Sequence, residues 1–476
     1  MWKSVVVIVI LKVILWEQCG AISALCPPDR NIVPLSQDNE ADSFCDCHMA
    51  HSTPWGLPTV TIDCQGREIQ DDDLPVNLTL PFATEDISLA WNNLTMPPTL
   101  ATAEHLRILT LSHNTISNID SSTPFIHLLN LRRLDLSFNQ LATLSDDAFD
   151  GLKHLQHLDL SHNHLTTLPS NVFANLPRLN HLLLSANPLA NFLSQENLFS
   201  YTGISKELKN LEVANCSLTK IHLDEEWTLS RLILRENLFS GVPDIPATVQ
   251  VLDFGGNFLK HIDQDTFPPL TILEELYLDN MIPLKTILEN AFVSISGKLR
   301  ILSLEGCRNM TTLDTFAFGN GTILRDGEEE QVLPLNLQMV NLRGCRLKRI
   351  SPKFLERAEN LTKVFLAGNP LICDCDCEWI HSLKHETGAQ CSLPVILRGT
   401  RVSALEMEQF NCDTMRSSVY TILNGLIVFA LLCACGVAIY LIVMKMKPSR
   451  RHVVQKLALT SPYARVTIQP NRAEHL

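Results

Sequence analysis

The sequence has few glycines and aromatic residues, no excess of proline, and fewer basic than acidic side chains. Its 19 glycines and 25 prolines among 476 residues are too few for a collagen-like or low-complexity chain. Lys and Arg number 38 against 51 Asp and Glu, so the net charge is −13, the wrong sign for binding to phosphates. We therefore expect a folded chain with no nucleic-acid partner.

Motifs that carry catalysis are also missing. No Ser/His/Asp set, phosphate-binding loop or pair of carboxylates stands out from the sequence, so we expect no enzyme, no cofactor and no metal centre. His157 and His181, with Asp159 nearby, offer zinc binding or pH sensing as an alternative, but two histidines make a poor site.

The two ends of the chain indicate a membrane protein. Residues 1–24 have Lys3, an apolar run and the small residues Ala21-Ile22-Ser23, which predicts a cleaved signal peptide rather than an uncleaved anchor. Residues 419–444 contain no charge, and as a helix of about 39 Å they can cross about 30 Å of hydrocarbon. Basic residues follow directly, which places residues 445–476 in the cytoplasm and predicts a single-pass type I protein.

Two features of this C-terminal part suggest contacts. Ala430, Ala434 and Ala438 form a seam of small residues through which two helices could pair as a homodimer. The last residues, Glu474-His475-Leu476, could add as a strand to a PDZ domain.

The middle of the chain repeats one unit. LRRLDLSFNQL at 131–141 and LQHLDLSHNHL at 155–165 share the pattern L-x-x-L-x-L-x-x-N-x-L, which recurs with a period near 24 over about twelve copies. Such a period predicts a solenoid. One longer gap contains the polar segment 319–335, which we interpret as an inserted loop without a role, although long loops are often functional.

The repeat has a structural reason. Side chains alternate along a strand, so Leu134 and Leu136 point inward while Arg133 and Asp135 point outward. One turn cannot bury its own leucines, so the turns must stack into a parallel sheet. The turn asparagines can bond backbone groups of adjacent turns, and a buried thiol replaces the amide in three copies. The asparagines are Asn114, Asn139, Asn163, Asn187, Asn237, Asn257 and Asn369, and the cysteines are Cys216, Cys307 and Cys345.

We therefore predict an α/β-type leucine-rich repeat solenoid with a parallel sheet on its concave face, mostly loops and 3-10 turns on its convex face, disulfide caps and one transmembrane helix. The expected domains are a signal peptide (1–24), an N-terminal cysteine cap (25–80), the repeats (81–368), a C-terminal cysteine cap (369–418), the transmembrane helix (419–444) and the tail (445–476).

The cysteines near the ends carry a family resemblance. The stretch from Cys373 to Cys412 resembles the C-terminal cap of extracellular leucine-rich repeat proteins, with matches that include Trp379, Pro394 and Phe410. The resemblance implies the pairs Cys373–Cys391 and Cys375–Cys412, and at the N-terminal cap Cys26–Cys47 and Cys45–Cys64. Cys377 departs from the pattern, so it could be unpaired, pair between chains or compete for a partner.

The chain as a whole resembles single-pass leucine-rich repeat adhesion and recognition proteins of animal cell surfaces, of the trophoblast glycoprotein, connectin and capricious/tartan types. This resemblance implies a plasma-membrane protein whose ectodomain binds an extracellular or cell-surface protein in adhesion or cell–cell recognition. The alternative is a co-receptor or modulator of a secreted ligand that signals through another membrane protein.

Two sets of surface residues follow from the repeat. Outward positions on the concave strands are candidate partner-binding residues: Arg133, Asp135, His157, Asp159, His181, Arg231, Arg235, Glu275, Tyr277 and Asp279. N-glycosylation sequons occur at Asn77, Asn93, Asn215, Asn309, Asn320 and Asn360. Residues 106–189 therefore form the longest sugar-free stretch.

Overall fold

The computed structural model describes residues 45–446, except 51–58, 82, 121–123, 195–200, 224–225, 321, 324–330, 333, 384–385 and 411. The chain forms two compact units, Met1–Glu406 and Met407–Leu476, and each is described by itself. The predicted signal peptide, Cys26 and residues 447–476 lie outside the described residues.

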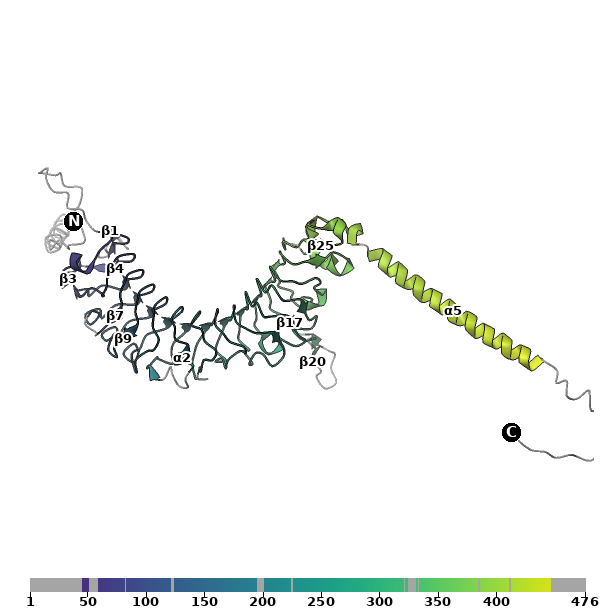
Figure 1. Ribbon diagram of the computed structural model, residues 1–476, viewed down its shortest axis with the longest axis horizontal. Helices are drawn as coiled ribbons and strands as arrows, with labels where there is room; N and C mark the ends of the chain where they lie inside the picture. The colour runs from purple at the N-terminus through teal and green to yellow at the C-terminus, as the bar shows by residue number, and fades with distance from the viewer. Residues whose placement is uncertain are drawn as a thin grey trace, which may run out of the picture. The chain divides into compact units, whose positions relative to one another are not determined.

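The first unit is built on one sheet of 14 strands that lines the inner side of the coil (Figure 1). The first two strands pair antiparallel, and every later neighbour in the sheet pairs parallel, one strand per turn. The strands, in sheet order, are β1 (Asp46–Ala50), β2 (Thr59–Asp63), β4 (Thr84–Ser88), β6 (Ile108–Thr110), β8 (Arg133–Asp135), β10 (His157–Asp159), β11 (His181–Leu183), β12 (Asn210–Glu212), β13 (Arg231–Ile233), β14 (Val251–Asp253), β16 (Glu275–Tyr277), β18 (Ile301–Ser303), β22 (Met339–Asn341) and β23 (Lys363–Phe365).

The leucines of the repeat form the core, as the alternation predicts. Leu134 and Leu158 pair in register across β8 and β10, and both are fully buried. Arg133, one residue before Leu134, is exposed. The predicted leucine-rich repeat solenoid is thus confirmed: each turn buries its leucines only against its neighbours.

The convex side has more regular structure than predicted. Short parallel strands pair there in three small sheets, besides the 3-10 turns η2 (Val293–Ile295) and η3 (Pro352–Phe354) and the one-turn helix α2 (Ala190–Leu193). These strands are β3 (Leu78–Thr79) with β5 (Leu100–Thr102), β7 (Asn118–Ile119) with β9 (Thr143–Leu144), and β15 (His261–Ile262), β17 (Thr286–Ile287) and β19 (Thr312–Leu313). Equal spacing of successive turns brings their backbones into bonding register on this side also.

The turn asparagines form the predicted ladder. Asn163 donates from Nδ2 to the carbonyls of Leu136, Leu160 and Ser161 at 3.0–3.2 Å, and its Oδ1 accepts from the Leu141 N–H at 3.0 Å. Asn92 bonds in the same way in the first repeat, although the sequence pattern did not single it out. Backbone groups that stacking would leave buried and unpaired are thereby satisfied.

The three ladder cysteines act as weak donors, as expected. Cys216 Sγ lies 3.4 Å from the Leu184 carbonyl, and Cys345 Sγ lies 3.2 Å from that of Leu304. Burial raises the pKa of Cys216 to about 11, so the thiol keeps the proton that it donates. One weak bond therefore replaces the amide's several bonds at these turns.

A stack of four rings runs along one edge of the N-terminal turns. The rings of Trp91, His113, Phe138 and His162 follow one another at centroid distances of 3.7, 4.2 and 3.9 Å, and their planes are nearly parallel. Each residue precedes a ladder asparagine and has a positive φ of 52–59°, which is unusual for a residue with a side chain. The same left-handed backbone at each turn aligns the rings.

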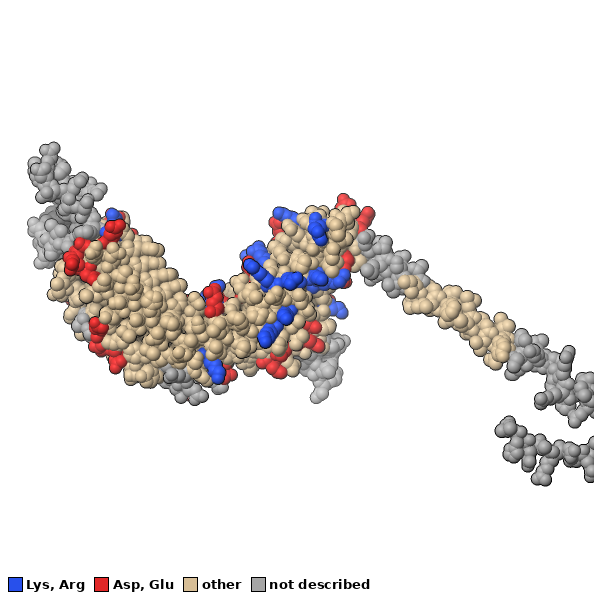
Figure 2. Space-filling model, in the orientation of Figure 1, with Lys and Arg blue, Asp and Glu red and all other residues tan. Residues whose placement is uncertain are grey.

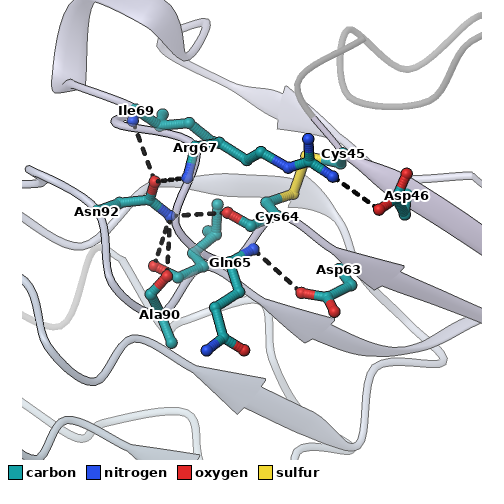
Figure 3. Close-up of a disulfide and its surroundings, with 10 residues drawn as sticks. Cys45, Asp46, Asp63, Cys64, Gln65, Arg67, Ile69, Ala90 and Asn92 are labelled. Carbon is teal, nitrogen blue, oxygen red and sulfur yellow. Dashed lines mark hydrogen bonds and ion pairs between the residues drawn. A yellow bond between two sulfur atoms is a disulfide. The ribbon is translucent and has the colours of Figure 1, made fainter.

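The caps carry two disulfides whose residues are all described. Cys45–Cys64 closes the N-terminal cap beside Asn92 (Figure 3), and Cys373–Cys391 joins β24 (Leu371–Ile372) to β25 (Cys391–Leu393). Both are pairs that the family resemblance implies. Cys47 is also disulfide-bonded, whereas Cys26 lies outside the described residues.

Besides the disulfide Cys373–Cys391, the C-terminal cap contains Trp379 and three further cysteines, Cys375, Cys377 and Cys412. Trp379, on α4 (Glu378–His381), donates from Nε1 to the Ile350 carbonyl at 3.0 Å. Cys377 is buried and unpaired, and burial raises its pKa to about 12. The side chain of Cys412 is outside the described residues, so the expected Cys375–Cys412 pair stays a prediction.

The inserted segment 319–335 is more ordered at its base than expected. β20 (Thr322–Ile323) and β21 (Gln331–Val332) pair antiparallel, which makes a short hairpin that Figure 1 shows on the convex side. Arg357 donates to the carbonyls of Phe318 and Gly319 at 2.6 and 3.0 Å and so fixes its start.

The second unit contains the helix α5 (Cys412–Met446), which begins before the predicted span. Its stretch Ile422–Ile442 is long and apolar enough to cross a membrane, by length and composition. Ala430, Ala434 and Ala438 lie four residues apart on this helix, so they share one face.

Candidate functional site

The predicted partner-binding residues all come from the concave sheet, but they fall into two regions. Arg133, Asp135, His157, Asp159 and His181 lie on β8, β10 and β11. The others lie on or next to β13 and β16: Arg231, Arg235, Glu275, Tyr277 and Asp279. The two regions differ in charge and in shape.

The N-terminal region contains a cavity of about 530 Å³, here called the arginine cavity. Its charged and polar lining comes from the sheet between β4 and β11. It consists of Glu85, Asp86, Arg107, Arg132, Arg133, Gln156, His157, Asn180 and His181, with Thr59 and Thr61 of β2 at one end. A smaller cavity of about 210 Å³ adjoins it at Arg107 and Arg132.

The arginine cavity holds more guanidinium than carboxylate groups. Arg107 forms an ion pair with Glu85, with 3.3 Å between Nη1 and Oε1. Arg132 and Arg133 form no ion pair with any described residue. Asp86 is half-buried, and its pKa is raised by that burial and by nearby Asp63, an effect that Arg133 opposes. The lining therefore has three guanidiniums and two carboxylates, and among the described residues only the guanidinium of Arg107 is in an ion pair.

The two histidines are neighbours in register on β10 and β11, as predicted, with their ring centroids 5.4 Å apart. Burial, with help from Arg133, lowers the pKa of His157 to about 4, so this imidazole is neutral at pH 7. The pKa of His181 is also lowered by burial. Asn210 donates from Nδ2 to His181 Nδ1 at 2.6 Å, so the hydrogen of His181 is on Nε2.

Two polar atoms in this cavity's lining are buried without a hydrogen-bond partner among the described residues. They are His157 Nε2 and Asn180 Oδ1. Both atoms are closed off from solvent, so they do not face the open part of the cavity, and each carries a desolvation cost.

The alternative of a zinc site finds no support in the described part of the chain. Asp159 accepts from the Ser161 N–H at 2.9 Å rather than from a histidine. No cluster of three or more His, Cys, Asp or Glu side chains that could hold a metal occurs among the described residues.

The middle of the concave sheet, from β12 to β16, has a row of carboxylates instead of a cavity. We call this row the acidic row. It consists of Glu212 on β12, Asp253 on β14, Glu275 on β16 and Asp279, two residues after β16. Burial raises the pKa of Glu212, Asp253 and Asp279. These carboxylates therefore lie where their charge is poorly solvated.

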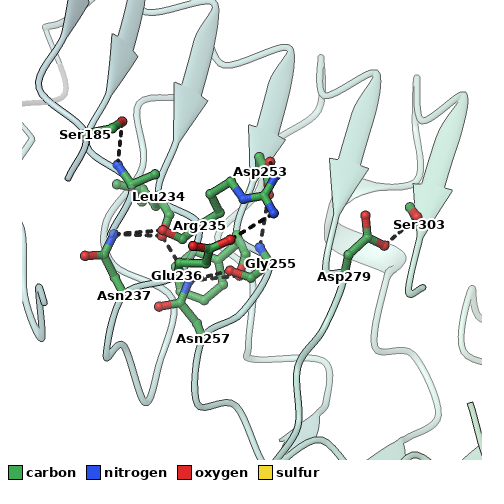
Figure 4. A network of polar contacts seen from close by, with 12 residues as sticks. Ser185, Leu234, Arg235, Glu236, Asn237, Asp253, Gly255, Asn257, Asp279 and Ser303 are labelled. Atoms are coloured by element: carbon green, nitrogen blue, oxygen red, sulfur yellow. Dashed lines mark hydrogen bonds and ion pairs between the residues drawn. The ribbon is translucent and has the colours of Figure 1, made fainter. Parts of the chain in front are cut away.

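Two arginines, Arg231 and Arg235, partly compensate the acidic row, and Figure 4 shows Arg235 beside Asp253. Arg235 lies 3.0 Å from Glu236 Oε1 and 3.8 Å from Asp253 Oδ2, and the charge of Arg231 lowers the pKa of Glu212 against the effect of burial. Asp279 accepts from Ser303 Oγ at 2.5 Å.

Tyr277 belongs to the same region of the sheet. It donates its hydroxyl to Glu275 at 2.9 Å, and burial raises the pKa of Tyr277 to about 12. The phenol therefore stays protonated and keeps this hydrogen bond at neutral pH.

Sequence reasoning missed Arg107, Arg132, Asn180 and Glu212 as members of these regions. The first three lie just before the strand positions that were considered, and the sequence signal for them is the segments LRIL (106–109) and LRRL (131–134). A residue directly before a concave strand lies at the edge of the sheet, and its side chain can line the same cavity as the strand residues.

The six sequon asparagines, Asn77, Asn93, Asn215, Asn309, Asn320 and Asn360, are all exposed. None is among the residues that line the arginine cavity. On the face shown in Figure 2, Lys and Arg gather over the C-terminal part of the solenoid.

Comparison with known proteins agrees with this fold. The family model described as "Leucine rich repeat" matches residues 104–155 and 129–189. The match covers part of the repeat region, and the fold of that region is a leucine-rich repeat solenoid.

Three similar proteins share parts of this sequence. Tsukushi from Gallus gallus is 28% identical over 325 residues, which cover 65% of this chain and 73% of that protein. Nephrocan from Mus musculus is 27% identical over 173 residues, 33% of each chain. CD180 antigen from Mus musculus is 25% identical over 271 residues, 53% of this chain and 38% of that protein. The chain thus spans less than two thirds of the length of Nephrocan and of CD180 antigen.

Among solved structures, the crystal structure of the TLR13–ssRNA13 complex is similar with a TM-score of 0.53 and 27% identity. The match covers 69% of this chain and 47% of that chain.

Proposed function

We propose that this chain is a cell-surface protein that binds a protein partner through the concave sheet of its solenoid, in cell adhesion or cell–cell recognition. The observation that carries the proposal is the concave face itself. It combines a cavity with unpaired guanidinium groups, a row of half-buried carboxylates and a tyrosine-bearing strand. Such a mixture of opposite charges and aromatic groups suits a protein surface.

A position outside the cell is part of this proposal. Disulfides in the caps fit an oxidising compartment, and one apolar helix near the C-terminus fits a single membrane span. The predicted signal peptide, the type I orientation and the plasma membrane complete the proposal. Pairing through the alanine seam and a PDZ contact of the C-terminus stay predictions.

A nucleic-acid partner, such as the ssRNA13 of the TLR13 complex, is less well supported here. The net charge is −13, and the acidic row interrupts the concave face. On the face in view in Figure 2, most basic side chains lie over the C-terminal part, and only scattered ones lie elsewhere. A polyanion requires a continuous basic track, which neither of these two surfaces offers.

The experiment expresses the full-length chain on suspension cells. Adhesion predicts that expressing cells cluster with each other or with cells that bear the partner. The co-receptor alternative predicts dispersed cells that capture a secreted factor from the medium. Cells that neither cluster nor capture a factor would contradict the proposal.

A further inference from the structure

The charges and hydrogen-bonding groups that line the arginine cavity define the kind of ligand that it can bind. Arg107 is held by Glu85, and Asp86 lies in the field of Arg133. The lining itself has three arginines, two carboxylates and a neutral pair of imidazoles, an excess of one positive charge, while Asp135 and Asp159 lie beside it at the ends of β8 and β10. Its hydrogen-bonding groups are mostly donors: the guanidiniums of Arg132 and Arg133, and Nε2–H of His181.

We propose that the arginine cavity is a binding subsite for a carboxylate side chain, Asp or Glu, presented by the protein partner. This inference rests on the proposed function and names the chemistry by which the partner is recognised. A carboxylate offers two acceptor oxygens, which the planar guanidinium group binds in a bidentate manner. It also supplies the one negative charge that the lining lacks.

The position of the cavity fits an incoming protein segment. The cavity lies on β4 to β11, and most of its lining residues are between the sequons Asn93 and Asn215 in the sequence. The turns that carry those residues therefore have no N-glycosylation site. A volume of about 530 Å³ is enough for a side chain with the backbone that carries it.

The test uses the full-length chain in lipid nanodiscs and three labelled probes: a tetra-glutamate peptide, a tetra-glutamine peptide and a single-stranded oligoribonucleotide. We expect the glutamate peptide to bind about tenfold more tightly than the glutamine peptide, because only the former can pair with the guanidiniums. The double variant Arg132→Gln/Arg133→Gln should abolish this preference.

A matched control comes from the neighbourhood of the acidic row. The variant Arg231→Gln/Arg235→Gln removes two arginines from the same concave side but from outside the cavity, and it should keep the preference for glutamate. Arg132→Lys/Arg133→Lys, which keeps the charge but not the bidentate geometry, should retain part of it. Unchanged thermal unfolding of each variant shows that the fold is intact.

Three results would overturn the inference: no preference of the wild-type chain for glutamate over glutamine, an equal loss in both arginine variants, or tighter binding of the oligoribonucleotide that depends on Arg132 and Arg133. The proposed function is judged separately, from clustering or capture by cells. Cells that cluster or capture a factor while the cavity ignores carboxylates would leave the proposed function standing and remove only the subsite.

Discussion

The arginine cavity and the acidic row are made from the same repeat, yet they present opposite chemistry. Both lie on strands with identical buried leucines, such as Leu158 under the cavity and Leu276 under the row. The outward positions differ in their balance: Arg133, His157 and His181 accompany Asp135 and Asp159 on β8 to β11, whereas Glu212, Asp253 and Glu275 outnumber Arg231 on β12 to β16. The core therefore specifies the fold, while binding chemistry is free to change from turn to turn.

The two regions also differ in what holds their turns together. The N-terminal turns have an asparagine at each ladder position and the ring stack from Trp91 to His162. The later turns use Cys216, Cys307 and Cys345 at three ladder positions. We expect the N-terminal turns to be the more rigid part.

The largest expected effect is on the ladder. Asn163→Ala removes three donated bonds and one accepted bond in the core, so it should lower the free energy of unfolding of residues 25–418 by about 3–5 kcal/mol. Cys345→Ala removes one weak bond and should cost about 1 kcal/mol. Urea unfolding measures both, and equal losses would show that the two kinds of ladder residue are equivalent.

The second-largest effect is expected in the pH dependence of the free energy of unfolding, through His157 in the arginine cavity. His157 has a folded pKa of about 4, below its unfolded value, so its neutral form stabilises the fold above about pH 6.5. That stability should be lost as the pH falls toward 4. Allowing for partial exposure, we expect wild type to lose about 1–2 kcal/mol more than His157→Gln between pH 7 and pH 4.5. Parallel pH profiles of the two proteins would contradict this.

The ring stack should contribute less. Phe138→Ala removes two stacked contacts, with His113 and His162, and should cost about 1 kcal/mol. Phe258 is similarly exposed, 47% against 43% for Phe138, but has no ring neighbour among the described residues. The control Phe258→Ala should therefore be the milder change in thermal unfolding, and the reverse order would rule out a stabilising stack.

The smallest effect is expected in the acidic row, with the opposite sign. Burial raises the folded pKa of Glu212 and Asp253, so their charged forms destabilise the fold at neutral pH. Glu212→Gln/Asp253→Asn should raise the stability at pH 7 by about 0.5 kcal/mol. The gain should disappear as the pH falls below the raised pKa values, because the wild-type carboxyls are then neutral too. A loss of stability at pH 7 would contradict this explanation.

The sequence predicted the sheet and its register because leucine spacing dictates which residues are buried. It therefore placed His157 and His181 as neighbours on adjacent strands, as the structure has them. It could not predict the cavity, because the cavity depends on the side-chain conformations of Arg107, Arg132 and Asn180, which directly precede β6, β8 and β11. The ring stack was missed because its members have no common residue type, only a common left-handed backbone before each ladder asparagine.

The hairpin of β20 and β21 was missed for another reason. Its strands are only two residues long and carry no alternation that distinguishes them from a loop. The base of the inserted segment is therefore a short hairpin, a detail that the prediction of an inserted loop did not contain.

The central claim is that the partner binds the concave sheet, and a glycan placed on that sheet tests it directly. Asp135→Asn creates a sequon with Leu136 and Ser137 on β8, while His164→Asn creates one with Leu165 and Thr166 at an exposed position of the next turn, outside the strand. The matched control Asp135→Asn/Ser137→Ala has the same loss of charge but no sequon.

The measurement is clustering, or capture of the secreted factor, by cells that express each full-length variant at equal surface levels. Glycan attachment is verified by the mass shift. Our account predicts that the glycan at position 135 abolishes the binding signal, that the control without a sequon loses at most the contribution of the Asp135 charge, and that the glycan at position 164 keeps the signal. An Asp135→Asn chain that carries its glycan and still binds like wild type would contradict the account.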